Sequence, residues 1–134
     1  MPNNLPVAVV GAGFSGTLLA INLLRLGQRV VLVERDGARL AKGQAFGTRR
    51  PEHLLNVRAA NMSAYPDDAD HFTRWMGFSG TGQVNRFVPR LAYGQYLLEE
   101  LIDALAAAEG RGEIRSAEVV SASFAATAGP AHLH

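Results

Sequence analysis

The sequence predicts an α/β fold with a parallel sheet, on the basis of three features near its start. Residues 7–10 form a short apolar run that is rich in β-branched side chains. A glycine-rich turn follows, and then a leucine-rich stretch at 17–26. A second apolar run lies at 30–33. The order strand, turn, helix, strand is that of a βαβ unit, whose two strands run parallel.

Composition indicates a single soluble domain. The chain has 134 residues, 48% of them hydrophobic, and its 13 Lys and Arg nearly balance 12 Asp and Glu, so we expect neither nucleic-acid nor membrane binding. Cysteine is absent, which excludes disulfides and thiolate chemistry. Apolar runs are much shorter than a membrane span, and the start lacks the basic region of a signal peptide. We expect a cytoplasmic protein.

The first strand and the turn carry the clearest functional signal. Val7 to Val10 is wholly apolar, which is typical of a parallel strand buried on both faces. The next six residues match G-x-G-x-x-G: Gly11, Ala12, Gly13, Phe14, Ser15 and Gly16. In this pattern the first glycine permits the tight turn, the second lets a pyrophosphate approach the backbone, and the third lets the helix pack on the strand. The turn and the helix N-terminus then bind a diphosphate through N–H groups.

The second strand ends in the residue that completes this site. The helix predicted over 17–26 ends at Gly27, and the strand at 30–33 leads into Glu34, about 20 residues beyond the turn, where a ribose-binding acid is expected. A carboxylate there accepts hydrogen bonds from ribose hydroxyls and repels a 2′-phosphate, which argues against NADP. The neighbouring Arg35 weakens that argument. A glycine turn with a purely structural role is the alternative.

The remainder predicts a loop, two helices and further strands. Residues 35–50 have the composition of a loop. The sequence predicts a short helix from Asp67, its N-cap, to Met76. Helical spacing places three of its apolar residues on one face, which we expect to lie in the core: Phe72, Trp75 and Met76. Pro89 begins a long helix that runs to about Glu109. Strands are expected at 113–115 and 119–124. His53 and His71 are isolated, and the pair His132 and His134 lies in the terminal tail, so we expect no metal site.

The turn belongs to a longer pattern, G-x-G-x-x-G-x-x-x-A-x-x-L-x-x-x-G, which is completed by Glu34. It resembles the N-terminal FAD fingerprint of flavoproteins with two dinucleotide-binding domains. With "HLLNVRAANMSAYPDDADHFTRWM" and "FVPRLAYGQYLLEELIDAL", the chain resembles the bacterial FAD/NAD(P)-binding family of flavin oxidoreductases, distant relatives of flavin and N-hydroxylating monooxygenases. The resemblance implies a Rossmann-like FAD-binding domain over 1–124, followed by a disordered or truncated tail at 125–134. FAD is favoured over NAD as cofactor, and NAD(P)H is the implied electron donor.

The resemblance also implies further cofactor contacts. Phe46 would lie against the flavin, Asn56 would be a polar contact on the flavin side, and Arg90 would approach the isoalloxazine edge. A backbone contact to adenine is implied at Val119. Two of these residues have a simpler alternative: Phe46 as core and Asn56 as a turn cap.

The resemblance is incomplete at the C-terminus. Members of the family are longer, with a second nucleotide-binding portion and a late strand that closes the FAD domain. The chain ends in "AATAGPAHLH", which offers no apolar strand. We favour truncation as the explanation for the missing segments. The alternatives are a half domain that another chain completes and a degenerate remnant of the family. An open sheet edge would also favour a homo-oligomer.

No residue qualifies as catalytic, so any reaction would be flavin chemistry, for which this chain alone is insufficient. The sequence therefore favours the FAD-binding portion of a flavin-dependent oxidoreductase. The alternatives are a non-catalytic FAD- or NAD-binding module and an inert fragment.

Overall fold

The parallel sheet predicted from the sequence is present. The computed structural model describes residues 5–36, 54–77, 87–124 and 130–134. Its largest sheet contains β1 (Val7–Val10), β2 (Val30–Glu34) and β5 (Gly112–Ser116), parallel and in the order β1-β2-β5. Val9 lies opposite Leu32 and Leu32 opposite Ile114. The carboxyl ends of the three strands therefore lie at one edge of the sheet.

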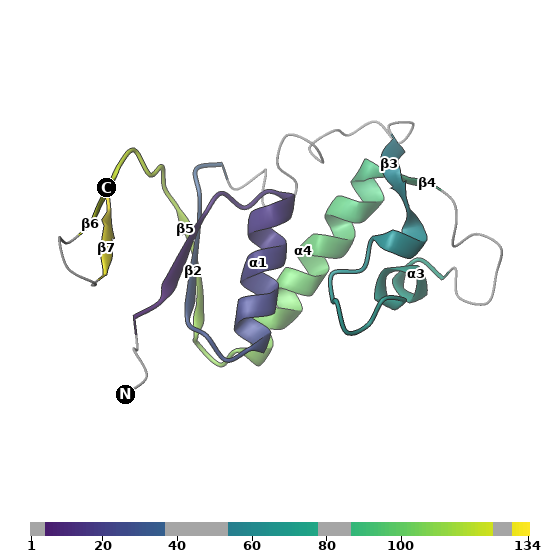
Figure 1. Ribbon diagram of the computed structural model, residues 1–134, viewed down its shortest axis with the longest axis horizontal. Coiled ribbons are helices and arrows are strands. Elements are labelled where there is room, and N and C mark those ends of the chain that lie inside the picture. The colour runs from purple at the N-terminus through teal and green to yellow at the C-terminus, as the bar shows by residue number, and fades with distance from the viewer. Residues whose placement is uncertain (1–4, 37–53, 78–86, 125–129) are drawn as a thin grey trace.

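Two helices, α1 (Phe14–Arg25) and α4 (Arg90–Ala107), pack side by side on one face of this sheet (Figure 1). Ile21 and Leu24 of α1 and Leu101 of α4 are buried with the inward side chains of β1 and β2. Helix α1 ends at the predicted glycine: Gly27 has φ +87°, and the Gly27 and Gln28 N–H groups donate to the carbonyls of Leu24 and Leu23, each at 3.1 Å. This is a Schellman motif, which directs the chain back toward the sheet as β2.

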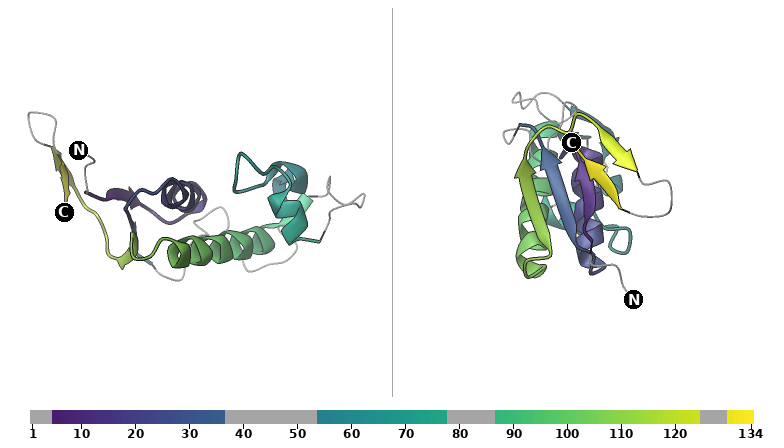
Figure 2. Two further views of the ribbon diagram at one scale, coloured as in Figure 1. Left: turned by 90° about the horizontal axis from the view of Figure 1, so that it is seen from below. Right: turned by 90° about the vertical axis from the view of Figure 1, so that its left-hand side faces the viewer.

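A second cluster of elements lies beyond α4, on the side away from the sheet (Figures 1 and 2). It contains β3 (Leu54–Arg58), the short 3₁₀ helix η2 (Ala59–Asn61), α3 (His71–Trp75) and β4 (Phe87–Pro89), with β3 antiparallel to β4. Phe72, Tyr93 and Tyr96 are fully buried here, and Trp75 and Met76 pack against them. The predicted core stripe of the short helix is confirmed.

The predicted start of that helix is wrong, because α3 begins at His71 and not after Asp67. The Asp67 carboxylate accepts two hydrogen bonds, each 3.3 Å long, from the Arg25 guanidinium on α1. The hydrogen bond from Arg25 lowers the pKa of Asp67. The carboxylate is therefore engaged with α1, and the chain passes through turns at 66–70 before the helix starts.

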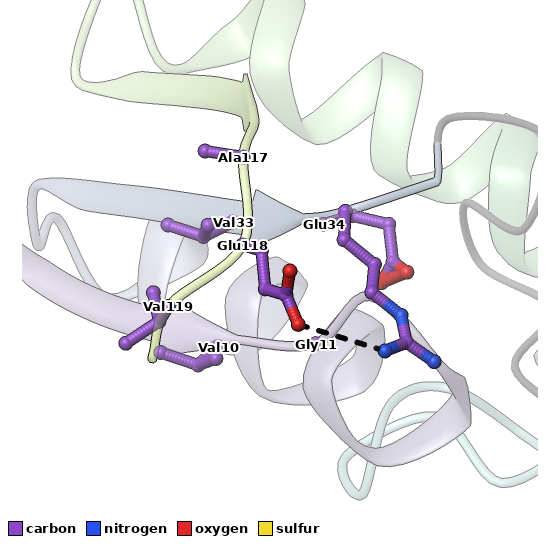
Figure 3. A pocket seen from close by; sticks show the side chains of 8 residues that line it. Val10, Gly11, Val33, Glu34, Ala117, Glu118 and Val119 are labelled. Atoms are coloured by element: carbon purple, nitrogen blue, oxygen red, sulfur yellow. Dashed lines mark ion pairs between the residues drawn. The ribbon is translucent and has the colours of Figure 1, made fainter. Parts of the chain in front are cut away.

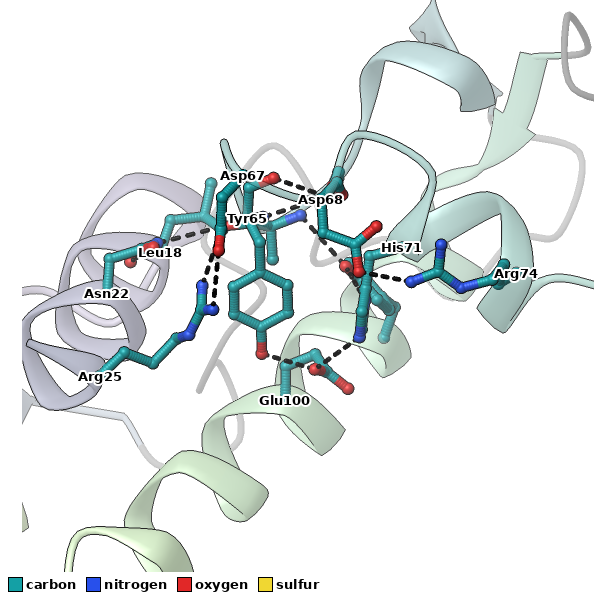
Figure 4. A network of polar contacts seen from close by, with 12 residues as sticks. Leu18, Asn22, Arg25, Tyr65, Asp67, Asp68, His71, Arg74 and Glu100 are labelled. Atoms are coloured by element: carbon teal, nitrogen blue, oxygen red, sulfur yellow. Dashed lines mark hydrogen bonds and ion pairs between the residues drawn. The ribbon is translucent and has the colours of Figure 1, made fainter.

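A network of polar side chains ties this cluster to the two long helices (Figure 4). The Tyr65 hydroxyl donates to Oε1 of Glu100 at 2.6 Å, and Nε2 of His71 lies 3.5 Å from the same oxygen. Nδ1 of His71 lies 2.8 Å from the Tyr96 hydroxyl, whose oxygen accepts the Ala64 N–H. Burial raises the pKa of Tyr96 to about 12. Glu100 is only 8% exposed, and sequence reasoning did not identify it as a buried carboxylate.

The C-terminal strands differ from expectation. The strand at 113–115 is confirmed as part of β5, but Val119 precedes the next strand, β6 (Ala122–Phe124), and is not within it. Within the stretch predicted to be a loose tail, β7 (Ala131–Leu133) pairs antiparallel with β6. The His134 N–H also donates to the Ser121 carbonyl at 2.9 Å. The hairpin lies across the sheet from the helices (Figure 1).

Strand β1 is not buried on both faces as predicted. Val7 is 38% exposed and Val10 is 55% exposed, whereas Val9, which packs with α1, is 6% exposed. The reason is topological: among the described strands β1 pairs only with β2, so it lies at the sheet edge (Figure 2). No described helix is long and apolar enough to cross a lipid bilayer.

Candidate functional site

The glycine turn between β1 and α1 is shaped by two of its three glycines. Gly11 has φ +94°, a conformation that side chains with a Cβ atom rarely adopt. A Cβ atom on Gly16 would lie 1.9 Å from the Gly11 carbonyl oxygen, so only glycine fits where the helix meets the turn. Gly13 has φ −76°, which any residue can adopt. Its own backbone conformation therefore does not require glycine.

No side chain caps the first N–H groups of α1. Its N-cap, Gly13, has no side chain to accept the first N–H groups, and the first turn has no acidic residue. The turn is itself held firmly: the Gly11 N–H donates to the Val33 carbonyl at 2.7 Å, and the buried Thr17 hydroxyl donates to the Ala12 carbonyl at 3.1 Å. A helix N-terminus of this kind attracts anions through its N–H groups and its dipole.

Glu34 at the tip of β2 contacts this turn directly. Its Oε2 atom accepts the Ala12 N–H at 3.0 Å, so the residue that ends the second strand is joined to the turn that follows the first. The parallel register makes this possible, because Val10 lies opposite Val33 and the two carboxyl ends coincide. The second carboxylate oxygen has no partner among the described residues and can accept a further hydrogen bond.

A cavity of about 180 Å³ lies at this edge of the sheet (Figure 3). Its lining is drawn from the ends of all three parallel strands: Val10, Gly11, Val33, Glu34, Arg35, Ala117, Glu118 and Val119. Small-molecule sites usually have volumes of roughly 300–1,000 Å³, so this cavity suits one end of a dinucleotide. Nη1 of Arg35 lies 3.9 Å from Oε1 of Glu118.

A larger cavity, of about 850 Å³, lies between the far face of the sheet and the β6–β7 hairpin, where Val7, Val31 and His132 contribute to its lining. It lies across the sheet from α1. The smaller cavity is the better candidate, because it is lined by Gly11 and Glu34, which the sequence predicts to take part in diphosphate and ribose binding.

Arg90, the first residue of α4, lies at the start of the helix that packs beside α1. Its Nε atom is buried and has no hydrogen-bond partner among the residues that the structure describes. One helical turn farther on, the Tyr93 ring lies 5.7 Å from the Phe14 ring at the start of α1. The two helix starts are therefore close in space, and the unpaired nitrogen is available to an anionic or polar ligand.

The structure brings together most of the residues predicted for the site. Gly11, Glu34, Arg35 and Val119 line one cavity, and the following residues belong to the adjoining turn and first helical turn: Gly13, Phe14, Ser15 and Gly16. Ser15 is exposed. Asn56 lies in β3, away from this cavity, and Phe46 lies outside the described residues. Sequence reasoning missed Glu118; its position just after the third parallel strand was the available signal.

Two comparisons with known proteins agree with this geometry. A family model described as FAD-NAD(P)-binding matches residues 8–133. A search of curated proteins gave no match. Among solved structures, THI4 from Thermovibrio ammonificans is similar, with a TM-score of 0.54 and 17% sequence identity over 96% of this chain. At that identity the likeness concerns the fold. The chain spans 45% of that protein's length. The sheet, the glycine turn and the family match show that the chain belongs to the FAD-NAD(P)-binding family.

Proposed function

We propose that the chain is the FAD-binding portion of a flavin-dependent oxidoreductase that takes its electrons from NAD(P)H. The hydrogen bond between Glu34 and the Ala12 N–H is the observation that carries the proposal. It positions a carboxylate beside an uncapped helix N-terminus, which is the arrangement that an adenine dinucleotide needs for its ribose and its diphosphate.

The residues present fit such a cofactor in three respects. Gly13 has an ordinary φ, so its lack of a side chain is best explained by the close approach of a ligand. The second carboxylate oxygen of Glu34 makes no hydrogen bond to the other described residues, and it can accept one from a ribose hydroxyl. Arg90 has a buried Nε atom that none of the described residues contacts through a hydrogen bond, as expected of a side chain that binds an anionic or polar group.

In this proposal each group has one task. The N–H groups of the turn and of the first turn of α1 bind the diphosphate, and Glu34 orients the ribose. Arg90 donates a hydrogen bond to the diphosphate or to the flavin edge. When bound, the flavin supplies the redox chemistry, and the chain excludes water and orients the ring. FAD is preferred over NAD because the glycine pattern continues through Ala20, Leu23 and Gly27.

The test is the absorbance spectrum of the purified chain, before and after reconstitution with FAD. We expect a yellow protein that releases free flavin on denaturation, and Glu34→Ala should retain markedly less flavin. NAD(P)H oxidation by the reconstituted protein then tests the electron donor. Glu113→Gln is the matched control, because Glu113 is an exposed acid on β5 outside the cavity lining.

The alternatives give different results. Bound NAD without flavin would indicate a non-catalytic dinucleotide-binding module. A colourless protein that binds neither FAD nor NAD would contradict the proposal.

A further inference from the structure

We propose that Glu118 is a specificity residue of the candidate site, which excludes 2′-phosphorylated dinucleotides by holding Arg35 in an ion pair. This inference rests on the proposed dinucleotide function and assigns a task to a residue outside the glycine turn. It concerns the sugar end of the ligand, where FAD and NAD carry a 2′-hydroxyl and NADP carries a phosphate.

The first step of the argument is the position of Arg35. It directly follows the ribose-binding candidate Glu34 and lines the same cavity. In dinucleotide-binding domains an arginine near this position accommodates the 2′-phosphate of NADP. Arg35 taken alone would thus give the site a cation for that phosphate and would counteract the repulsion from Glu34.

The second step is the partner of Arg35. Glu118 lies in the segment that leaves β5, on the other side of the cavity, and its Oε1 atom is 3.9 Å from Nη1 of Arg35 (Figure 3). Among the described residues that line the cavity, the charged ones are two carboxylates and one guanidinium. Paired with Glu118, the guanidinium is not free to offset the repulsion between Glu34 and a dianionic phosphate.

The third step concerns magnitude. Both side chains are 63% exposed, so the pair is screened by water and salt. We therefore expect a moderate effect. Releasing the Arg35 guanidinium from the pair should tighten a phosphorylated ligand about three- to tenfold, and it should leave a neutral sugar nearly unaffected.

The experiment compares ADP-ribose with 2′-phospho-ADP-ribose by isothermal titration calorimetry at low ionic strength, using the full chain. We expect the wild type to prefer ADP-ribose about tenfold or more, and Glu118→Gln to reduce this preference about three- to tenfold by tightening the phosphorylated ligand. Glu113→Gln is the matched control, because it removes the same charge from another exposed ion pair, on β5. In that pair Oε1 of Glu113 lies 2.9 Å from Nε of Arg115. This variant should leave the preference unchanged.

A double variant tests whether Glu118 acts through Arg35. If Glu118 acts through Arg35, the effect of Glu118→Gln should largely disappear when Arg35 is replaced by Gln. An unchanged preference in Glu118→Gln, or an effect of the same size in the Arg35→Gln background, would overturn the inference while leaving the proposed function intact. Failure of the wild type to bind ADP-ribose at all would overturn both.

Discussion

The Glu34 carboxylate accepts the Ala12 N–H at 3.0 Å, although the two residues lie on either side of helix α1 in the sequence. The contact joins the end of β2 to the glycine turn after β1. In the proposed function Glu34 therefore has two tasks, because its carboxylate both holds the turn and binds the ribose of the dinucleotide. These tasks can be separated by substitution.

Glu34→Gln should retain the turn and lose most of the binding. The amide oxygen of Gln can still accept the Ala12 N–H, so the free energy of unfolding should change by less than about 0.5 kcal/mol. The charge-assisted hydrogen bonds to ribose would be lost, and dinucleotide affinity should fall about tenfold. Urea unfolding and calorimetric titration measure the two effects. Full affinity in Glu34→Gln would show that the carboxylate charge does not contribute to binding.

Gly16→Ala should destabilise the fold as well as the site. The new Cβ atom would lie 1.9 Å from the Gly11 carbonyl oxygen, and neither backbone segment can move without disturbing the turn. We expect a loss of about 2 kcal/mol or more in the free energy of unfolding, together with loss of cofactor. Leu19→Ala is the control in the same helix, since Leu19 is 51% exposed. Equal stability of the two variants would contradict the packing described here.

Arg90→Met should have opposite effects on stability and on binding. The buried Nε atom has no hydrogen-bond partner within the described part of the chain, and an unpaired buried polar atom costs about 1–3 kcal/mol. An apolar side chain of similar length removes that cost, so the melting temperature of the apoprotein should stay the same or rise, while FAD affinity falls. A variant that loses stability and binds FAD normally would show that Arg90 has a structural role only.

Glu100→Ala should weaken the attachment of α3 and its preceding turns to α4. Without the carboxylate, the Tyr65 hydroxyl loses its 2.6 Å hydrogen bond, and we expect a loss of about 1–3 kcal/mol in the free energy of unfolding. Glu99→Ala is the matched control one position earlier in α4: Glu99 accepts an exposed hydrogen bond from Trp75 at 2.9 Å, and its loss should cost less than about 1 kcal/mol. Similar losses in both variants would argue against a special role for the buried carboxylate.

Stability should fall at alkaline pH because of Tyr96. Its pKa is about 12 in the folded state against 10.0 in the unfolded state, so the unfolded state releases its proton first as the pH rises. The contribution is fully present below pH 10 and is lost between about pH 10 and pH 12. Burial also raises the pKa of Tyr65 and Tyr93, which adds to the effect. Urea midpoints measured across this range should fall, and Tyr96→Phe should show a shallower decline. An identical decline in the variant would exclude Tyr96 as a contributor.

The amino-acid pattern by itself determined the βαβ unit and the core of the binding site. Short β-branched runs, a glycine turn and a leucine-rich stretch are local signals, so the positions of β1, α1, β2 and the long helix followed from them. The positions of Gly11 and Glu34 beside one cavity were also predictable, because parallel strands bring their carboxyl ends to one edge.

Only the tertiary structure decided what depends on distant partners. Asp67 has the sequence context of a helix cap, but it pairs with Arg25 because α1 lies beside it. Val10 is as apolar as a core residue, but it is exposed because β1 pairs with β2 alone among the described strands. Glu100 and Glu118 look like ordinary surface acids, and their neighbours Tyr65 and Arg35 come from other elements. Burial and charge pairing depend on which segments meet in space, and a one-dimensional pattern does not contain that information.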